Sequence, residues 1–156
     1  SDIVCSVLRW YKKIALSVLH NMKYLSDYIE EKQSTLFKKH GVFFAFSDKQ
    51  YQEQKKEGVK YVSLGMGTLC PKENAKAFID EHHDLVKAGI AQDVEENGID
   101  GVIIRELGNH EAFYTGDAES TVDALEGYPT TKEYIWQLFR KEDSRRANEE
   151  WEKIKV

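Results

Sequence analysis

The stretch Gly41-Val42-Phe43-Phe44-Ala45-Phe46-Ser47 decides the predicted fold, because it interrupts a chain that is otherwise rich in helical patterns. Its β-branched and aromatic residues are typical of a short buried strand, which we place at residues 42–46. A second strand is predicted at 61–64, followed by a glycine-containing turn at 65–67 and a brief third strand at 68–69. Together these segments predict a small antiparallel β-element of two to three strands.

Amphipathic helices are predicted on both sides of this β-element. Before it, apolar residues recur every three or four positions, which indicates a long N-terminal helix from about residue 3 to residue 39 that stops at Gly41. The residues of this stripe are Val4, Val7, Tyr11, Ala15, Val18, Met22, Leu25 and Ile29. After the β-element, Pro71 suits the first turn of a helix, and an apolar face runs from Ala75 to Val94 before Gly98. The predicted fold class is therefore α+β, mostly α, with four to five further helices.

Several polar residues are predicted to mark the starts of shorter helices. Ser47 and Thr130 each open a capping box, in which a hydroxyl accepts a hydrogen bond from a backbone amide three residues later. Asp100 is predicted to cap the helix that follows Gly98. The turn at residues 115–117 is predicted to start a short helix that ends at Gly127.

Length and composition indicate one ordinary globular domain. The chain has 156 residues, 41% of them apolar, and a net charge of −5, which argues against a general phosphate-binding role. Cys5 and Cys70 are isolated, which is typical of reduced thiols in a cytoplasm, and no apolar run reaches the ~20 residues of a membrane span. We expect a helical extension at 1–21, a core domain at 22–140 and a charged helical tail at 141–156. Met22 is alternatively an internal start, with the preceding residues an added extension.

The segment from Arg105 to Asp117 is the most suggestive one for function. It concentrates polar and aromatic side chains, and we expect them to line a hollow that faces the aromatic hairpin. The predicted binding residues are Arg105, Asn109, His110, Tyr114, Asp117, Phe44 and Tyr61. This interpretation requires that the polar groups are open to solvent and not used to cap helices or satisfy interior amides.

A metal site is the alternative interpretation of the same segment. Glu106 and His110 are four residues apart, so on a helix both point the same way, and His82 and Asp117 can add further ligands. Such a site would make the protein a metal-dependent hydrolase. The same residues are also typical of a core histidine, a surface pair and a helix cap.

The aromatic strand and the glycine turn allow two interpretations. Aromatic faces at Phe44 and Tyr61, beside glycine amides and Arg105, can hold a nucleobase by stacking and anion contacts. Aromatic residues in a strand are more often packing residues against neighbouring helices. The turn lacks the later glycine and the Lys-Ser/Thr of a phosphate loop.

The basic N-terminal helix also has several interpretations. Its cations are Arg9, Lys12, Lys13 and Lys23, against the single acid Asp2. It can form a partner-binding or homodimer face, lie on a membrane surface, or pack on the domain. A nucleic-acid-binding accessory role through this helix is a further alternative, although the overall acidity argues against nucleic acid as a partner.

Four segments resemble a family of small uncharacterised proteins from bacteriophages, mobile elements and the bacteria that carry them. They are residues 41–47, 61–65, 70–74 and the string Asn109-His110-Glu111-Ala112-Phe113-Tyr114-Thr115-Gly116-Asp117. The resemblance covers about Met22 to Arg140. It implies a bacterial host cytoplasm and a role in phage–host conflict or element maintenance, and it implies no assigned activity.

These observations favour a non-enzymatic binding protein that engages a host protein or a small ligand. No catalytic set emerges from the sequence, and no cofactor is implied. The alternatives that stay open are the hydrolase and the nucleic-acid-binding protein.

Overall fold

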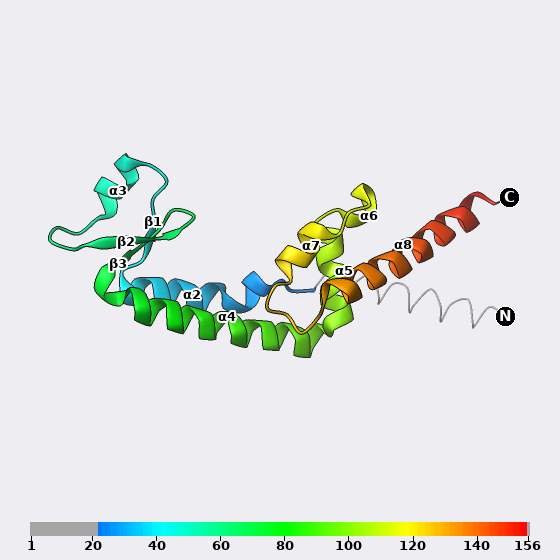
Figure 1. The fold of residues 1–156 in the computed structure, drawn as a ribbon, viewed down its shortest axis with the longest axis horizontal. Helices are drawn as coiled ribbons and strands as arrows, with labels where there is room; N and C mark the ends of the chain where they lie inside the picture. Colours follow the sequence, from blue (N-terminus) through cyan, green and yellow to red (C-terminus); the bar gives the residue numbers. More distant parts are fainter. Residues whose placement is uncertain (1–21, 156) are drawn as a thin grey trace. The chain divides into compact units, whose positions relative to one another are not determined.

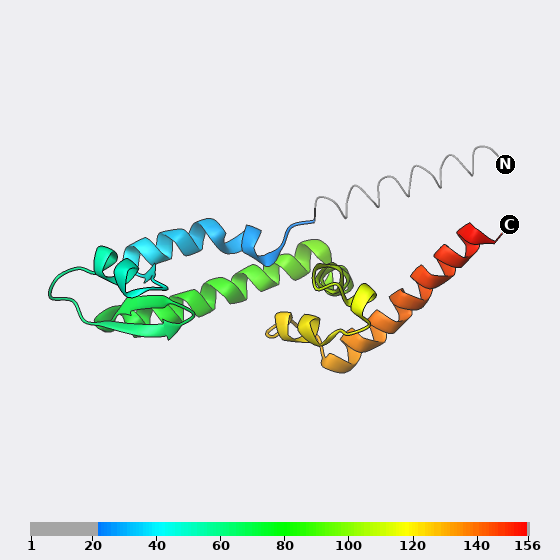
Figure 2. The same cartoon turned by 90° about the horizontal axis from the view of Figure 1, so that it is seen from above.

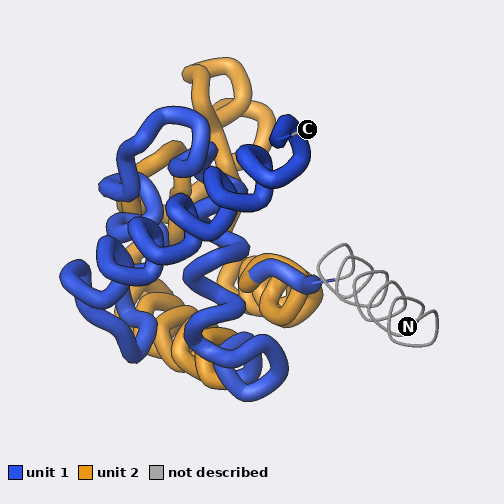
Figure 3. The backbone as a smooth tube through the Cα atoms, turned by 90° about the vertical axis from the view of Figure 1, so that its right-hand side faces the viewer, with its two compact units in different colours: residues 1–24, 92–156 blue, residues 25–91 orange. Residues whose placement is uncertain are grey.

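The computed structural model describes residues 22–155, and the part of the predicted N-terminal helix at 3–21 lies outside them. The chain divides into two compact units, which are coloured separately in Figure 3. Unit 2 comprises Leu25–Ala91, and unit 1 comprises Gln92 onward together with the described residues 22–24. Mostly helical secondary structure with one small antiparallel sheet confirms the predicted fold class.

Unit 2 is built on two helices, α2 (Leu25–His40) and the part of α4 (Ala75–Asn97) that precedes residue 92. They lie side by side in both Figure 1 and Figure 2. Gly89 permits their close approach, because a Cβ added there would lie 2.4 Å from Cγ2 of Ile29. The predicted stop is confirmed, since α2 ends at His40 and Gly41 adopts a left-handed φ of +70°.

The sheet has the order β1-β3-β2 with antiparallel pairing throughout. Its strands are β1 (Phe43–Phe44), β2 (Tyr61–Gly65) and β3 (Thr68–Pro71). The first strand is shorter than the predicted 42–46, because the backbone N–H of Phe46 donates to Gln50 Oε1 at the start of the next helix. Pro71 ends β3 and precedes a 3₁₀ turn, η1 (Lys72–Asn74), so the prediction that it lies in the first turn of a helix was wrong.

The two phenylalanines of β1 point to opposite faces of the sheet, as the alternation of a strand requires. Phe43 contacts Tyr51 and Tyr61, with ring centroids 6.4 and 5.2 Å away. Tyr51 belongs to α3 (Asp48–Gln54), which begins as predicted with the Ser47 hydroxyl accepting from the Gln50 amide. Phe44 contacts Phe37 of α2 instead, at 5.3 Å. The core of unit 2 beneath the sheet consists of Val42, Cys70 and Phe78.

The turn between β2 and β3 allows a direct test of this packing. Gly67 has a φ of +74°, and a Cβ added there would lie 2.5 Å from the ring of Phe46. Gly67→Ala should therefore lower the free energy of unfolding by about 1–2 kcal/mol, through left-handed strain, and displace that ring. Gly58→Ala is the matched control, since Gly58 has a φ of +77° with no atom near its Cβ position. Urea denaturation should show a larger loss at Gly67, and an equal loss would contradict the ring contact.

Unit 1 contains the end of α4 from Gln92 and four further helices. They are α5 (Ile99–Asn109), α6 (Ala112–Thr115), α7 (Glu119–Ala124) and α8 (Lys132–Ile154). Asp100 does not cap α5 as predicted, because Gly98 occupies that position with a φ of +70°. Thr131, one residue after the predicted Thr130, caps α8 by accepting from the Tyr134 amide. The short α6 was not predicted.

The core of unit 1 lies where α5 packs against its neighbours. Val102, Ile103 and Leu107 of α5 are fully buried, as is Ala112 of α6. Ile135 and Phe139 of α8 are also buried. The residues between Arg105 and Asp117 therefore alternate between this core and the surface, and this placement determines which of them can contact a ligand.

Candidate binding surfaces

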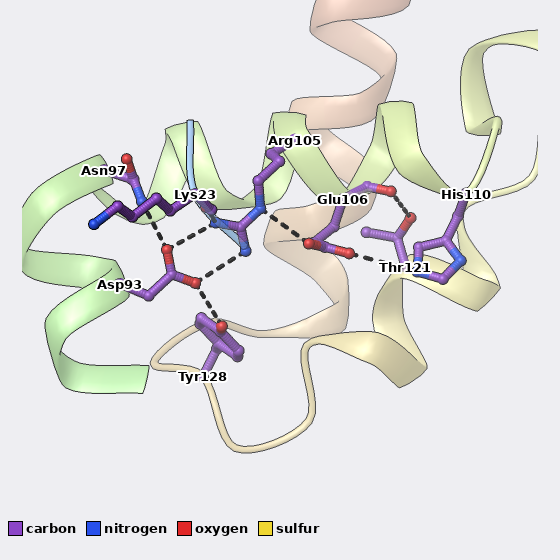
Figure 4. Close-up of polar contacts among 8 residues, drawn as sticks. All are labelled: Lys23, Asp93, Asn97, Arg105, Glu106, His110, Thr121 and Tyr128. Atoms are coloured by element: carbon purple, nitrogen blue, oxygen red, sulfur yellow. Dashed lines mark hydrogen bonds and ion pairs between the residues drawn. The ribbon is translucent and has the colours of Figure 1, made fainter. Parts of the chain in front are cut away.

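Arg105 lies in a buried polar network, which Figure 4 shows. Its guanidinium makes a two-point ion pair with Asp93 of α4: Nη1 donates to Oδ1 at 2.7 Å and Nη2 donates to Oδ2 at 2.9 Å. Nη1 also donates to the backbone carbonyl oxygen of Lys23 at 2.7 Å. The hydroxyl of Tyr128 donates to Asp93 Oδ2 at 2.6 Å, and the Asn97 amide donates to Oδ1 at 2.8 Å. These bonds link four separate segments of the chain, which contain Lys23, residues 93–97, Arg105 and Tyr128.

The environment of this network keeps its ion pair charged. Desolvation alone would raise the pKa of Asp93, which is completely buried, but hydrogen bonds from Arg105, Tyr128 and Asn97 outweigh it and hold the pKa below its usual value. Burial also raises the pKa of the Tyr128 phenol, and its bond to Asp93 adds to the effect. The pKa of Arg105 is raised, because its bonds to Asp93 and Glu106 exceed its desolvation. The guanidinium of Arg105 is thus paired with internal partners and is not presented to a ligand.

Glu106 and His110 do meet, as their helical spacing predicted. Glu106 Oε1 accepts from Arg105 Nε at 3.0 Å, and its Oε2 lies 3.5 Å from His110 Nε2. The backbone carbonyl of Glu106 also accepts from the buried Thr121 hydroxyl at 3.3 Å. The network therefore extends from Asp93 to His110, whose side chain is about one-third exposed. This imidazole reaches the surface at one end of the network, as the partly buried Asn97 does at the other.

The other residues of the predicted site lie on the exterior of unit 1. Asp117 caps the following turn, because its Oδ1 accepts from the Glu119 amide at 2.9 Å. Asn109 is exposed at the end of α5, and Tyr114 of α6 is 92% exposed. Glu111 has a left-handed φ of +56°, so the turn that presents Tyr114 carries backbone strain. Tyr114 and Asn109 thus remain accessible, whereas Arg105 and Asp117 have internal partners.

The four residues of the metal alternative are distributed over both units. Glu106 and His110 are neighbours in unit 1, and the Asp117 carboxylate accepts from the Glu119 amide. His82 belongs to unit 2, where its ring stacks against Phe78 at 5.5 Å. Within residues 22–155, no three His, Cys, Asp or Glu side chains form a group suited to hold a metal ion.

Unit 2 carries an apolar groove between α2, α4 and the sheet. Its larger part is a hollow of about 530 Å³, and an adjoining part of about 300 Å³ continues along α2 toward the start of that helix. Phe37 and Phe44 border both parts. The apolar residues of this groove are Ile29, Phe37, Phe44, Leu64, Phe78, Ile79 and Val86. We call this surface the apolar groove.

Polar groups surround the apolar groove. Ser26, Glu30, Gln33 and Ser34 of α2, Thr68 of β3, and His82 and His83 of α4 complete its lining. Ile79 is half exposed and Phe44 is 46% exposed, although both are large apolar side chains. Exposed apolar residues that gather in one hollow are typical of a binding site, unlike single ones scattered over a surface. Phe46, which follows β1, and Met66, in the turn between β2 and β3, are also exposed large apolar residues.

The sequence identified only part of this surface. Phe44, a predicted binding residue, borders the groove, whereas Tyr61 packs on the other face of the sheet and accepts from the Lys56 amide through its hydroxyl. Phe37 and Ile79 were not singled out as site residues. The sequence did contain a signal for Ile79. Phe78 and Ile79 are adjacent on α4, which makes its apolar face wide, and one of the two side chains faces outward.

Comparison with known proteins gives one match. The model of a family of unknown function (DUF7659) matches residues 25–141. No curated protein and no solved structure matches the chain. The helices between residues 22 and 155 lack the length and apolarity needed to cross a membrane.

Proposed function

The chain belongs to the DUF7659 family of unknown function, and from its geometry we propose that it is a non-enzymatic binding protein that holds an apolar segment of a partner protein. The main support for this proposal is the apolar groove, where Phe44 and Ile79 are about half exposed beside a hollow of about 530 Å³. Keeping such side chains in water has a free-energy cost that a partner would remove. The groove lies entirely within unit 2.

The shape and chemistry of the groove favour a helical segment with large apolar side chains. The groove follows α2 from Ser26 to Phe37, a distance of about 16 Å at 1.5 Å per residue. Three turns of an amphipathic helix have this length and present anchors at positions i, i+3, i+4 and i+7. Hydroxyl and amide groups along the edge, such as Gln33 and Ser34, can pair with the polar side of such a helix.

The proposed setting is a bacterial cell that carries a phage or mobile element. This part of the proposal rests on the four sequence segments that resemble proteins of such elements, three of which (residues 41–47, 61–65 and 70–74) contribute to the sheet beside the groove. A protein of a mobile element that binds a host protein needs a recognition surface and no catalytic group. The apolar groove supplies a surface of this kind.

A matched pair of variants tests the proposal. Ile79→Asp places a carboxylate in the groove, and Ile154→Asp makes the same change at a 69% exposed position on α8. A protein captured from bacterial lysate by the full chain would be purified and titrated against both variants by calorimetry. We expect Ile79→Asp to weaken binding by at least about tenfold, since a charge would be buried against apolar groups, and Ile154→Asp to bind like the unaltered chain.

Two results would contradict the groove as the binding site. One is equal affinity of the two variants for the purified partner. The other is a partner whose binding is lost with Ile154→Asp alone. Circular dichroism of Ile79→Asp checks that the loss is one of contact, and the half-exposed position of Ile79 leads us to expect a native spectrum.

A further inference from the structure

A single carboxylate borders the apolar groove. Of the described residues that line it, Glu30 is the only acid, and none is lysine or arginine. Glu30 is exposed, and among the described residues its carboxylate has no ion-pair or hydrogen-bond partner. Resting on the proposed function, we infer that the groove selects a cationic amphipathic helix, one whose lysine or arginine pairs with Glu30 while its apolar face fills the hollow.

The geometry of α2 places Glu30 on the groove and the nearest cation of this helix away from it. Four residues of α2 at spacings of four, three and four follow one side of the helix and line the groove: Ser26, Glu30, Gln33 and Phe37. Lys32, two residues after Glu30, points about 200° around the helix axis from it and does not line the groove. The Glu30 charge therefore remains available to a partner that covers this surface.

The wall formed by α4 supplies groups that suit several kinds of polar partner. His82 and His83 line the larger part of the groove, and the His82 ring stacks against Phe78 at 5.5 Å. Neither imidazole forms a hydrogen bond or ion pair with another described residue. A neutral imidazole has one donor and one acceptor nitrogen, so it can pair with either kind of group. Glu30 is therefore the residue that sets the charge preference of the groove.

The groove is also asymmetric along its length. Glu30 lines the smaller part, whereas Leu64, Phe78 and Ile79 line the larger part. Phe37 borders both parts and lies seven residues after Glu30, which is about two helical turns or about 10 Å. We therefore expect the partner's cation about two turns from the apolar side chain that packs against Phe37. This pattern defines a partner sequence more narrowly than an apolar face alone.

Covering Glu30 makes the groove discriminate between partners by charge. A helix that lays an apolar or acidic side chain over Glu30 removes water from the carboxylate without replacing its hydrogen bonds, which opposes binding. A lysine or arginine at the same place compensates for the lost water. Because the pair lies at an exposed edge, it affects specificity and association rate more than total affinity, and added salt screens it. The apolar residues of the groove provide most of the binding free energy.

Two synthetic peptides test the inference with the full chain. Each has about 14 residues, or about four helical turns, with leucines at positions i, i+3, i+4 and i+7. One carries lysine at both ends of this apolar face, and the other carries glutamate there. Fluorescence anisotropy would compare their binding to the unaltered chain, to Glu30→Lys and to Glu31→Lys. Glu31 is an exposed neighbour that does not line the groove, and both variants change the net charge equally.

At low salt we expect the lysine peptide to bind the unaltered chain at least about threefold more tightly than the glutamate peptide, and Glu30→Lys to reverse this order. Glu31→Lys should retain the order, and about 0.5 M salt should remove most of the difference. Equal effects of the two variants would overturn the inference, since they would reflect the general field of the protein. Equal affinity of the two peptides, or no binding of either, would also overturn it.

Ile79→Asp distinguishes failure of this inference from failure of the proposed function. Lysine-peptide binding that is unaffected by Ile79→Asp would place the peptide elsewhere and overturn both. Peptides without a charge preference, together with partner binding that Ile79→Asp weakens, would overturn this inference and leave the proposed function intact. Thermal unfolding checks that Glu30→Lys is folded, which its exposed position leads us to expect.

Discussion

Asp93→Ala is expected to lower the free energy of unfolding of unit 1 by about 3–5 kcal/mol, the usual cost of leaving a buried charge without its partner. Asp93 is fully buried, and its carboxylate accepts from Arg105, Tyr128 and Asn97. Removing it leaves the buried guanidinium of Arg105 with the Glu106 carboxylate and the Lys23 carbonyl oxygen, but without the two-point ion pair. Urea denaturation followed by circular dichroism would measure the loss.

An exposed aspartate on the same helix provides the control. Asp80 forms a surface pair with Lys76 at 3.7 Å, so Asp80→Ala should change stability by about 0.5 kcal/mol or less. The double variant Asp93→Leu, Arg105→Met should recover much of the loss, because it removes both charges together. Similar effects of Asp93→Ala and Asp80→Ala would show that the network does not hold unit 1 together.

The network should also make stability depend on pH. The pKa of Asp93 is lowered in the folded protein, so its contribution is present above the unfolded value of about 3.9 and is lost as pH falls through the lower folded value. The stability difference between the unaltered chain and Asp93→Asn should therefore narrow below about pH 4. A difference that widens in acid would contradict the direction of this pKa shift.

Leu107→Ala is expected to cost about 2–5 kcal/mol, since it removes a fully buried side chain from α5 and leaves a cavity. Leu107 lies between Arg105 and Asp117, so this result would show that the most suggestive segment of the sequence has a structural core. Leu138→Ala on α8 is the control, because Leu138 is only partly buried. Thermal and urea unfolding should place Leu107→Ala well below Leu138→Ala in stability. Equal losses would mean that α5 is not the centre of unit 1.

Local signals in the sequence predicted much of the fold. The hydroxyl of Ser47, the glycine after His40 and the glycine turn before Thr68 act over three or four residues, and all three features are confirmed. The long α4 was predicted from its apolar face and from the glycine at its end. The capping prediction at Asp100 was wrong because Gly98 alone adopts the left-handed backbone between α4 and α5 without strain.

The candidate site was less accessible to sequence reasoning, because its decisive contacts join distant segments. Asp93 and Arg105 are 12 residues apart on different helices, and Tyr128 is a further 23 residues away. Nothing in the local pattern around Arg105 distinguishes an internal ion pair from an anion-binding group. For the groove, strand alternation at Phe43 and Phe44 did contain the needed information: only one of two neighbouring aromatic residues can face a given side of the sheet.

We propose that partner binding depends on the apolar groove of unit 2, while the segment from Arg105 to Asp117 mainly supports unit 1. A single titration compares Ile79→Asp with Tyr114→Ala, which alters the most exposed residue of that segment. We predict that the purified partner loses at least about tenfold in affinity for Ile79→Asp and binds Tyr114→Ala as it binds the unaltered chain. Loss of affinity at Tyr114 with full binding at Ile79→Asp would contradict the claim.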